Sequence, residues 1–329
     1  MDQLTIPKVF TIPGSHPFLD SLADGLRNQF NTKPEALSGA TVLLPTRRAC
    51  RAMRDAFLRK SGGTPVLLPQ LLPLGDIDED ELQISTFGGM DDGIEIGGHS
   101  TISTPPAIPR LRREILLARL ILANPHSVTG PNQAVRLARE LARLLDQVHT
   151  EKLSFDRLKD LVPDDFAGYW QTTLDFLKVI TDAWPKLLSA EGFLDPAEHR
   201  NILLLMRSNL WRDSQTKQVV IAAGSTGSIP ATANLLSEIA RLQKGAVILP
   251  ALDLEMEETV WNQLEPTHPQ YGMAKLLRQM NTSRKEVSIW PGIRSRRDDS
   301  RTRFVNAAMT PAAAPQPVLN SIDFRKSIK

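Results

Sequence analysis

Alternation between buried strands and helices occurs near both ends of this 329-residue chain but not in its middle. Short apolar runs typical of strands occupy residues 8–12, 41–44 and 65–68, and similar runs return at 218–223 and 245–249. Successive strand–loop–helix units imply right-handed crossovers and a parallel sheet, with the functional loops at the carboxyl ends of its strands. The sequence therefore predicts an α/β fold in which one domain is interrupted by a mainly helical insertion.

These patterns divide the chain into five parts. Residues 1–75 and 214–292 supply the two parts of the α/β domain. Residues 107–213 form the helical insertion, in which apolar residues recur at helical spacing and prolines separate at least four helices. Acids, glycines and serines in residues 76–106 favour an exposed flexible connector, and the basic, Pro/Ala-rich residues 293–329 are expected to form a disordered tail.

Composition excludes several classes of site. Cys50 is the only cysteine, so this chain holds no internal disulfide and no iron–sulfur or zinc site built from several of its own cysteines. The six histidines lack metal-ligand spacing, and we expect no metal site. Asp253, at the end of a strand segment, is the one acid worth testing for Mg²⁺, although a plain loop role is favoured. Neither a membrane span nor a signal peptide is recognisable, so we expect a cytoplasmic protein without a membrane partner.

An arginine-rich segment provides the first candidate site. The net charge is only +2, but residues 8–60 contain nine basic residues and residues 76–95 contain eight acids and no base. An apolar strand at 41–44 leads directly into a helix with several arginines, and this geometry can present groups to a phosphate backbone. We expect DNA contacts from the following residues: Thr46, Arg47, Arg48 and Arg51. The alternative is that these arginines form an ordinary solvated helix face.

A glycine- and serine-rich loop provides the second candidate. It follows the strand at 218–223 and opens a helix, so its backbone N–H groups could cradle a phosphate. The candidate residues are Gly224, Ser225, Thr226, Gly227 and Ser228. The loop carries no lysine, and the Gly-x-x-x-x-Gly-Lys-Ser/Thr loop of nucleotide hydrolases is absent from the whole chain. The alternative is a tight turn in which Ser228 caps the helix.

Five strings in order resemble one known family. They are TVLLPTRRA (41–49), LPLGDIDED (72–80), WQTTLDFL (170–177), AAGSTGSIPAT (222–232) and HPQYG (268–272). Together they resemble the N-terminal part of the AddB subunit of the AddAB helicase–nuclease in its alphaproteobacterial form, over residues 7–292. The resemblance implies a RecA-like domain of superfamily 1 helicase type with a helical insertion. It also implies a role in DNA double-strand break repair with an AddA partner, and it puts Thr46, Arg47 and Arg48 in the place of helicase motif Ia, which contacts single-stranded DNA.

Departures from that family limit what the chain can do. Full-length relatives use ATP and Mg²⁺ and hold an iron–sulfur cluster with four cysteines beside a nuclease domain. None of these groups can be assigned to residues present here, so we expect no cofactor and no catalytic residue in this chain. We interpret the chain as a truncated or frame-shifted form of such a protein, with DNA binding as its residual activity. One alternative is a helical protein-interaction scaffold without DNA affinity, whose arginines pair with the acids at 76–81. Another is a small-molecule phosphate enzyme that uses residues 224–228.

Overall fold

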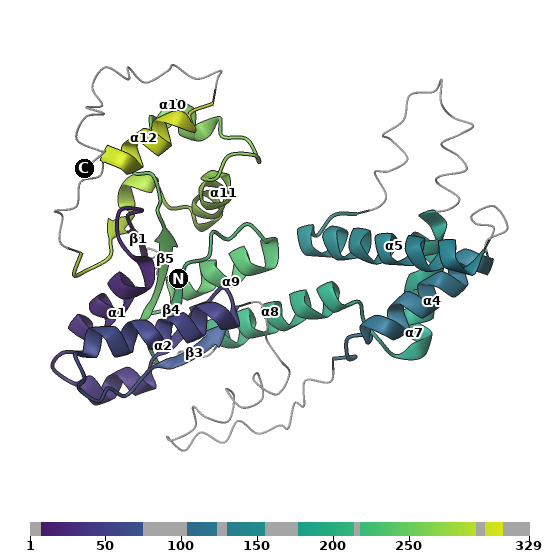
Figure 1. The fold of residues 1–329 in the computed structure, drawn as a ribbon, viewed down its shortest axis with the longest axis horizontal. Coiled ribbons are helices and arrows are strands. Elements are labelled where there is room, and N and C mark those ends of the chain that lie inside the picture. Colours follow the sequence, from purple (N-terminus) through teal and green to yellow (C-terminus); the bar gives the residue numbers. More distant parts are fainter. Residues whose placement is uncertain are drawn as a thin grey trace. The chain divides into compact units, whose positions relative to one another are not determined.

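Two compact units make up the chain in the computed structural model, one formed by Met1–Ile77 with Leu205–Lys329 and the other by Asp78–Leu204 (Figure 1). The structure describes residues 8–74, 104–123, 130–154, 177–213, 218–293 and 300–311. Within these residues, no helix has the length and apolar character needed to span a membrane.

The first unit is built on a six-stranded sheet in which every pair of neighbouring strands is parallel. The strands are β1 (Val9–Ile12), β2 (Thr41–Leu44), β3 (Gln70–Pro73), β4 (Val220–Ala223), β5 (Gly245–Pro250) and β6 (Ser288–Ile289). Their order across the sheet is β3-β2-β4-β5-β1-β6. This arrangement confirms the predicted parallel α/β fold.

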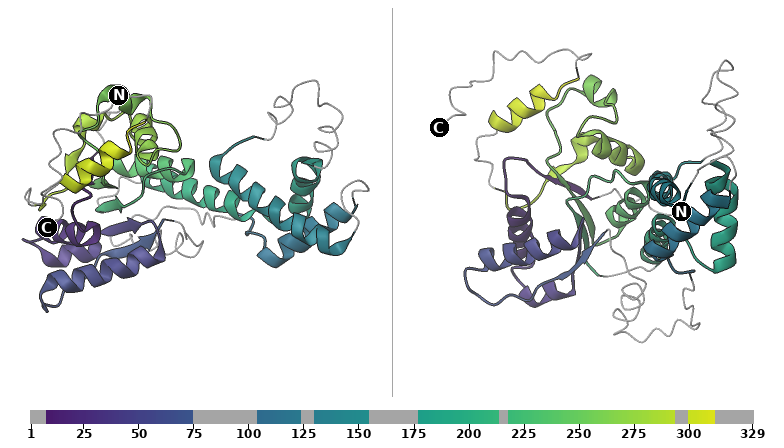
Figure 2. Two further views of the ribbon diagram at one scale, coloured as in Figure 1. Left: turned by 45° about the horizontal axis from the view of Figure 1, so that its top comes forward. Right: turned by 45° about the vertical axis from the view of Figure 1, so that its right-hand side comes forward.

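Helices cover both faces of the sheet (Figure 2). Those of this unit are α1 (Phe18–Gln29), η1 (Pro34–Gly39), α2 (Arg47–Ser61), α9 (Pro230–Arg241), α10 (Glu258–Asn262), α11 (Tyr271–Met280), η5 (Arg284–Glu286) and α12 (Ser300–Ala308). Helices α1 and α2 pack together on one face, and α9 and α11 lie on the other. The central strands β2 and β4 are fully buried, as expected for a parallel sheet covered on both sides.

Alternate strand residues form the core beneath α1 and α2. This cluster includes Ile12, Val42, Leu44, Ile221, Ala223 and Ile248 from the strands, and Leu22, Leu26, Met53 and Phe57 from the helices. Their spacing follows the period of two that places every second side chain on the same face of a strand. Because the apolar residues of α2 occupy one stripe of the helix, its arginines are directed to solvent.

The prediction of a strand at 65–68 is wrong, because strand β3 begins at Gln70. The residues 65–68 have no regular structure, and Leu67 is 60% exposed. Pro65 and Pro69 lack the N–H group that a strand donates to its neighbour, whereas Gln70 donates to the carbonyl of Ala40 at 2.9 Å. Pairing therefore starts only after the second proline.

Helix α12 lies in the segment for which the sequence predicts a disordered tail. Residues 300–308 contain no proline or glycine, and the first proline beyond them is Pro311, so the local sequence permits a helix that ends before it. Tail residues 294–299 and 312–329, and residues 76–103 of the acidic connector, lie outside the described residues.

The second unit consists of helices. They are α4 (Arg110–Ala123), α5 (Pro131–Glu151), the π-helical turn η4 (Val179–Ala183), α7 (Trp184–Glu191) and the start of α8 (Pro196–Asp213). Helices α4 and α5 pack along each other, and their apolar stripes share a core that includes Leu117, Ile121, Leu141, Leu145 and Trp184. This core is separate from that of the sheet.

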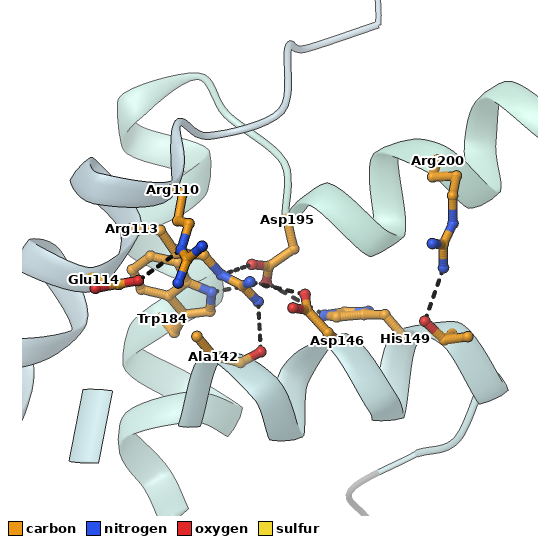
Figure 3. A network of polar contacts seen from close by, with 10 residues as sticks. Arg110, Arg113, Glu114, Ala142, Asp146, His149, Trp184, Asp195 and Arg200 are labelled. Atoms are coloured by element: carbon orange, nitrogen blue, oxygen red, sulfur yellow. Dashed lines mark hydrogen bonds and ion pairs between the residues drawn. The ribbon is translucent and has the colours of Figure 1, made fainter. Parts of the chain in front are cut away.

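A buried carboxylate contacts three helices of the helical unit (Figure 3). Asp195, only 1% exposed, forms an ion pair of 2.8 Å with Nε of Arg113 on α4 and accepts a hydrogen bond of 2.9 Å from Nε1 of Trp184 on α7. Nε2 of His149 on α5 lies 3.4 Å from the same carboxylate. Arg113 also pairs with Asp146 at 2.8 Å. The charge of Asp195 is thus balanced by Arg113 and His149 and stabilised by the hydrogen bond from Trp184. A buried carboxylate without such partners would be strongly destabilising.

Burial and pairing shift two pKa values in this network. The hydrogen bond to Asp195 raises the pKa of His149 above its ordinary value of 6.5, against the opposing effect of desolvation. Burial by itself would raise the pKa of Asp195, but its contacts with His149, Arg113 and Trp184 outweigh burial and lower that pKa. Each shift favours the charged form of its group, so the pair is most stabilising when both are ionised.

We predict that the free energy of unfolding falls as the pH rises from about 6 to 8 and that His149→Gln reduces this fall. The contribution of protonated His149 is complete below its ordinary pKa and is lost as the pH rises through the higher folded-state pKa. Urea denaturation at several pH values measures the effect, with His199→Gln as a control that removes another histidine of this unit. An unchanged pH dependence in His149→Gln would contradict the assignment.

A second prediction concerns the contact between α1 and the strand-end residue Trp290. Trp290 is 1% exposed and packs edge-on against Phe10, and a Cβ on Gly25 would lie 2.0 Å from its Nε1 atom. Gly25→Ala should therefore lower the free energy of unfolding by about 1–3 kcal/mol, the usual cost of overpacking a core. Gly39→Ala is the matched control, because nothing lies within 4 Å of the added Cβ there. Chemical denaturation that gave equal stabilities for both variants would refute the prediction.

Candidate nucleic-acid interface

Thr46 joins the buried strand β2 to helix α2. Its backbone is extended (φ −145°, ψ 159°), and its Oγ1 accepts a hydrogen bond of 3.1 Å from the N–H of Ala49. Thr46 is therefore the N-cap of α2, a position at which threonine satisfies one of the free N–H groups of the first turn. The cap leaves the hydroxyl hydrogen of Thr46 able to donate to an anion.

The arginines of α2 form one exposed face of the helix, which we call the arginine face (Arg47, Arg48, Arg51 and Arg54). Its buried counterpart consists of Cys50, Met53, Ala56 and Phe57, which pack into the core of the sheet unit. The arginine face begins at the positive end of the helix dipole, so both the side chains and the helix favour an anion at this place.

The two ends of α2 differ in how their cations are compensated. Near the C-terminal end, Arg59 pairs with Asp20 at 2.5 Å and Lys60 pairs with Asp24 at 2.6 Å, which attaches α2 to α1. In the part of the chain that the structure describes, no carboxylate pairs with Arg48, Arg51 or Arg54. The positive charge available to a ligand is therefore concentrated in the first half of α2. The acids at 76–81 lie outside the described residues.

The glycine- and serine-rich loop connects β4 to α9. Gly224 and Gly227 have φ values of +80° and +64°, which explains why glycine occupies both positions. The N–H of Gly224 donates to the carbonyl of Ile248 at 2.9 Å, and the N–H of Gly227 donates to Oγ of Ser225 at 3.3 Å. Two of the N–H groups that a phosphate cradle would use are thus engaged within the protein, which leaves those of Ser225, Thr226 and Ser228 as candidates.

Ser228 does not cap α9. The N-cap position is Ile229, which has no side-chain cap, and Pro230 opens the helix. Proline fits this position because the first N–H groups of a helix have no partner within it. Ser228 is an exposed residue.

The two candidate segments are far apart in the sequence but adjacent at the edge of the sheet. Strand β2 pairs with β4 through the register Thr41–Val220, Val42–Ile221 and Leu43–Ala222. A Cβ on Gly224 would lie 3.6 Å from Cδ of Pro45, so the two exit loops are neighbours. The start of the arginine face at Thr46 and the loop that begins at Gly224 therefore lie at neighbouring strand exits.

This place is also a switch point of the sheet. From β2 the chain continues through α2 to β3 on one side, whereas from β4 it continues through α9 to β5 on the other side. The connecting helices lie on opposite faces (Figure 2). In parallel α/β sheets, ligands bind outside the carboxyl ends of strands at such a point.

Phe18 is a candidate that sequence reasoning missed. It begins α1, is half-buried, and its Cε1 lies 3.2 Å from where a Cβ on Gly224 would be. An aromatic ring beside the two exit loops can stack on a base of a single strand. The sequence does place Phe18 in the loop–helix junction that follows the first strand, where functional groups of α/β proteins often lie. Its position beside the β4 exit loop, however, depends on the sheet, in which β1 pairs with β5 and β5 pairs with β4.

Asp253 has a local structural role. One oxygen of its carboxylate accepts hydrogen bonds from the N–H groups of Glu255 at 2.9 Å and Met256 at 3.0 Å, and its carbonyl accepts one of 3.0 Å from Arg284. Among the described residues, no group of three or more His, Cys, Asp or Glu side chains is placed to hold a metal ion. Asp253 therefore orders the loop after β5.

Comparisons with models of protein families and with curated proteins found no match to this chain. The fold and the surface define an α/β protein with a parallel sheet and a basic surface at the carboxyl edge of that sheet. The assignment of a function to this surface therefore depends on its geometry and charge.

We predict that Thr46→Ala lowers the free energy of unfolding by about 1 kcal/mol, because it removes the side-chain acceptor at the start of α2. Thr46→Ser retains an oxygen at this position and should restore most of the stability. Guanidinium denaturation of the three proteins makes the comparison. Equal stabilities of the wild type and Thr46→Ala would contradict a capping role.

Proposed function

We propose that this protein binds DNA through Thr46, Arg47, Arg48 and Arg51, and that it acts as an AddB-like component of an ATP-dependent helicase–nuclease that processes DNA double-strand breaks. The observation that carries the proposal is the exposed arginine face at the start of α2, in which Arg48 and Arg51 pair with no carboxylate of the described residues.

The proposed binding mode is electrostatic. Guanidinium groups donate several hydrogen bonds in a fixed geometry that suits phosphate oxygens, and the N-terminus of α2 adds a favourable dipole. Thr46 lies at the same position and can donate its hydroxyl hydrogen. Contacts of this kind position a nucleic acid without reading its sequence, so affinity depends on salt more than on base composition.

The family part of the proposal is supported by the five sequence strings and by the interrupted sheet. The two parts of the sheet come from 8–73 and 220–289, with the helical unit between them in the sequence, which is the arrangement that a RecA-like domain of superfamily 1 type with a helical insertion requires. In this proposal the partner is an AddA subunit, and ATP, Mg²⁺ and the iron–sulfur cluster belong to the complete enzyme. No catalytic step is assigned to this chain.

We predict that replacing Arg47, Arg48 and Arg51 together with glutamine weakens binding of a single-stranded oligonucleotide roughly tenfold or more at low salt, because each arginine that is replaced removes a charge-assisted phosphate contact. The slope of log affinity against log salt should fall by about 2, since each lost contact with a single strand contributes roughly 0.7. Fluorescence anisotropy over a range of salt concentrations measures both quantities.

The matched control replaces three exposed arginines of the helical unit, Arg119, Arg136 and Arg143, with glutamine, so that both triple variants have the same net charge. If both triple variants bind equally, the arginine face is not the DNA site. If the wild type binds no DNA but copurifies with a protein partner, the chain is an interaction scaffold instead.

A further inference from the structure

A cavity of about 700 Å³ that is open to solvent lies on the helical unit, and we call it the α7 cavity. It is bounded by α5, η4, α7 and the first turn of α8. Its apolar wall includes Leu145, Val148, Ile180, Leu188, Phe193 and Leu194. The volume and the mainly apolar lining are those of small-molecule sites, which combine such walls with a few polar groups.

The local helix geometry at this cavity is unusual. Residues 179–183 form a π-helical turn directly before α7, and three of them, Ile180, Thr181 and Asp182, line the cavity. Pro185, which also lines it, has no N–H and so cannot make the usual helical bond to the carbonyl of Thr181. Single π turns of this kind are frequent at functional sites.

The charges around the cavity are unbalanced. Asp195 and the neighbouring Asp146 are compensated by Arg113 and His149. Asp182 and Glu198 also line the cavity; Glu198 interacts electrostatically with His149, and among the described residues neither carboxylate forms a direct ion pair. No lysine or arginine is among the described lining residues, so the two carboxylates leave the site with a net negative charge.

We propose that the α7 cavity binds a small organic cation, which consists of an apolar, preferably aromatic, group and one ammonium group. The apolar group of the ligand would pack against the apolar wall, and Asp182 and Glu198 would face its ammonium group. Asp182 is exposed and Glu198 is half-buried, so the ligand's charge need not be fully desolvated. The site is independent of the DNA surface proposed above, because all of its described lining residues belong to the helical unit.

The test uses benzylammonium as the probe and benzyl alcohol as its neutral counterpart, with the full chain, by isothermal titration calorimetry. Benzylammonium should bind about fivefold more tightly than benzyl alcohol, the effect expected of exposed ion pairs. The double variant Asp182→Asn, Glu198→Gln should weaken benzylammonium binding by about fivefold and leave benzyl alcohol binding unchanged.

The matched control is Glu140→Gln, Glu265→Gln, which removes two exposed carboxylates outside the cavity and should leave both affinities unchanged. Ser189→Phe, which places a ring at the cavity wall, should abolish the binding of both probes while the circular dichroism spectrum stays native. Equal affinities for the two probes, an unchanged affinity in the Asp182/Glu198 variant, or no binding at millimolar concentrations would overturn the proposal.

Discussion

The sheet unit depends on the parallel pairing of β2 with β4, which together with that of β1 with β5 joins two distant parts of the chain. The two strands are separated by more than 170 residues, yet their register from Thr41–Val220 to Leu43–Ala222 joins the two parts of the sheet. Both strands are fully buried, so the pairing is favoured by apolar burial on both faces as well as by backbone hydrogen bonds. Closing so long a loop costs entropy, but this cost grows only slowly with loop length.

That pairing also decides what the carboxyl edge of the sheet contains. The exit of β2 supplies a capped helix start with arginines, and the exit of β4 supplies a tight loop with two left-handed glycines. Because the two exit loops are neighbours at Pro45 and Gly224, a phosphate held at the start of the arginine face would lie near the N–H groups of Ser225, Thr226 and Ser228. In the proposed DNA-binding mode, the two loops would then contribute to a single binding region.

The helical unit has its own central interaction, the buried carboxylate of Asp195. It contacts Arg113, His149 and Trp184, each from a different helix, so it fixes the mutual positions of α4, α5 and α7 (Figure 3). A buried charge without these partners would be strongly destabilising. The α7 cavity lies beside this centre, because His149, Trp184 and Asp195 are among its lining residues.

By itself, the sequence determined the fold class, the start of α2 at Thr46–Arg47 and the absence of a lysine phosphate loop, because apolar periodicity, capping and motif spacing are local properties. The sequence analysis put the third strand at 65–68, but β3 begins at Gln70. The reason is that Pro65 and Pro69 have no N–H group to donate to a neighbouring strand. Only the tertiary structure decided that Phe18 and the β4 exit loop lie together, and that Pro185 and Asp182 line a cavity. These relations depend on strand order and helix packing, which join residues that no local pattern in the sequence connects.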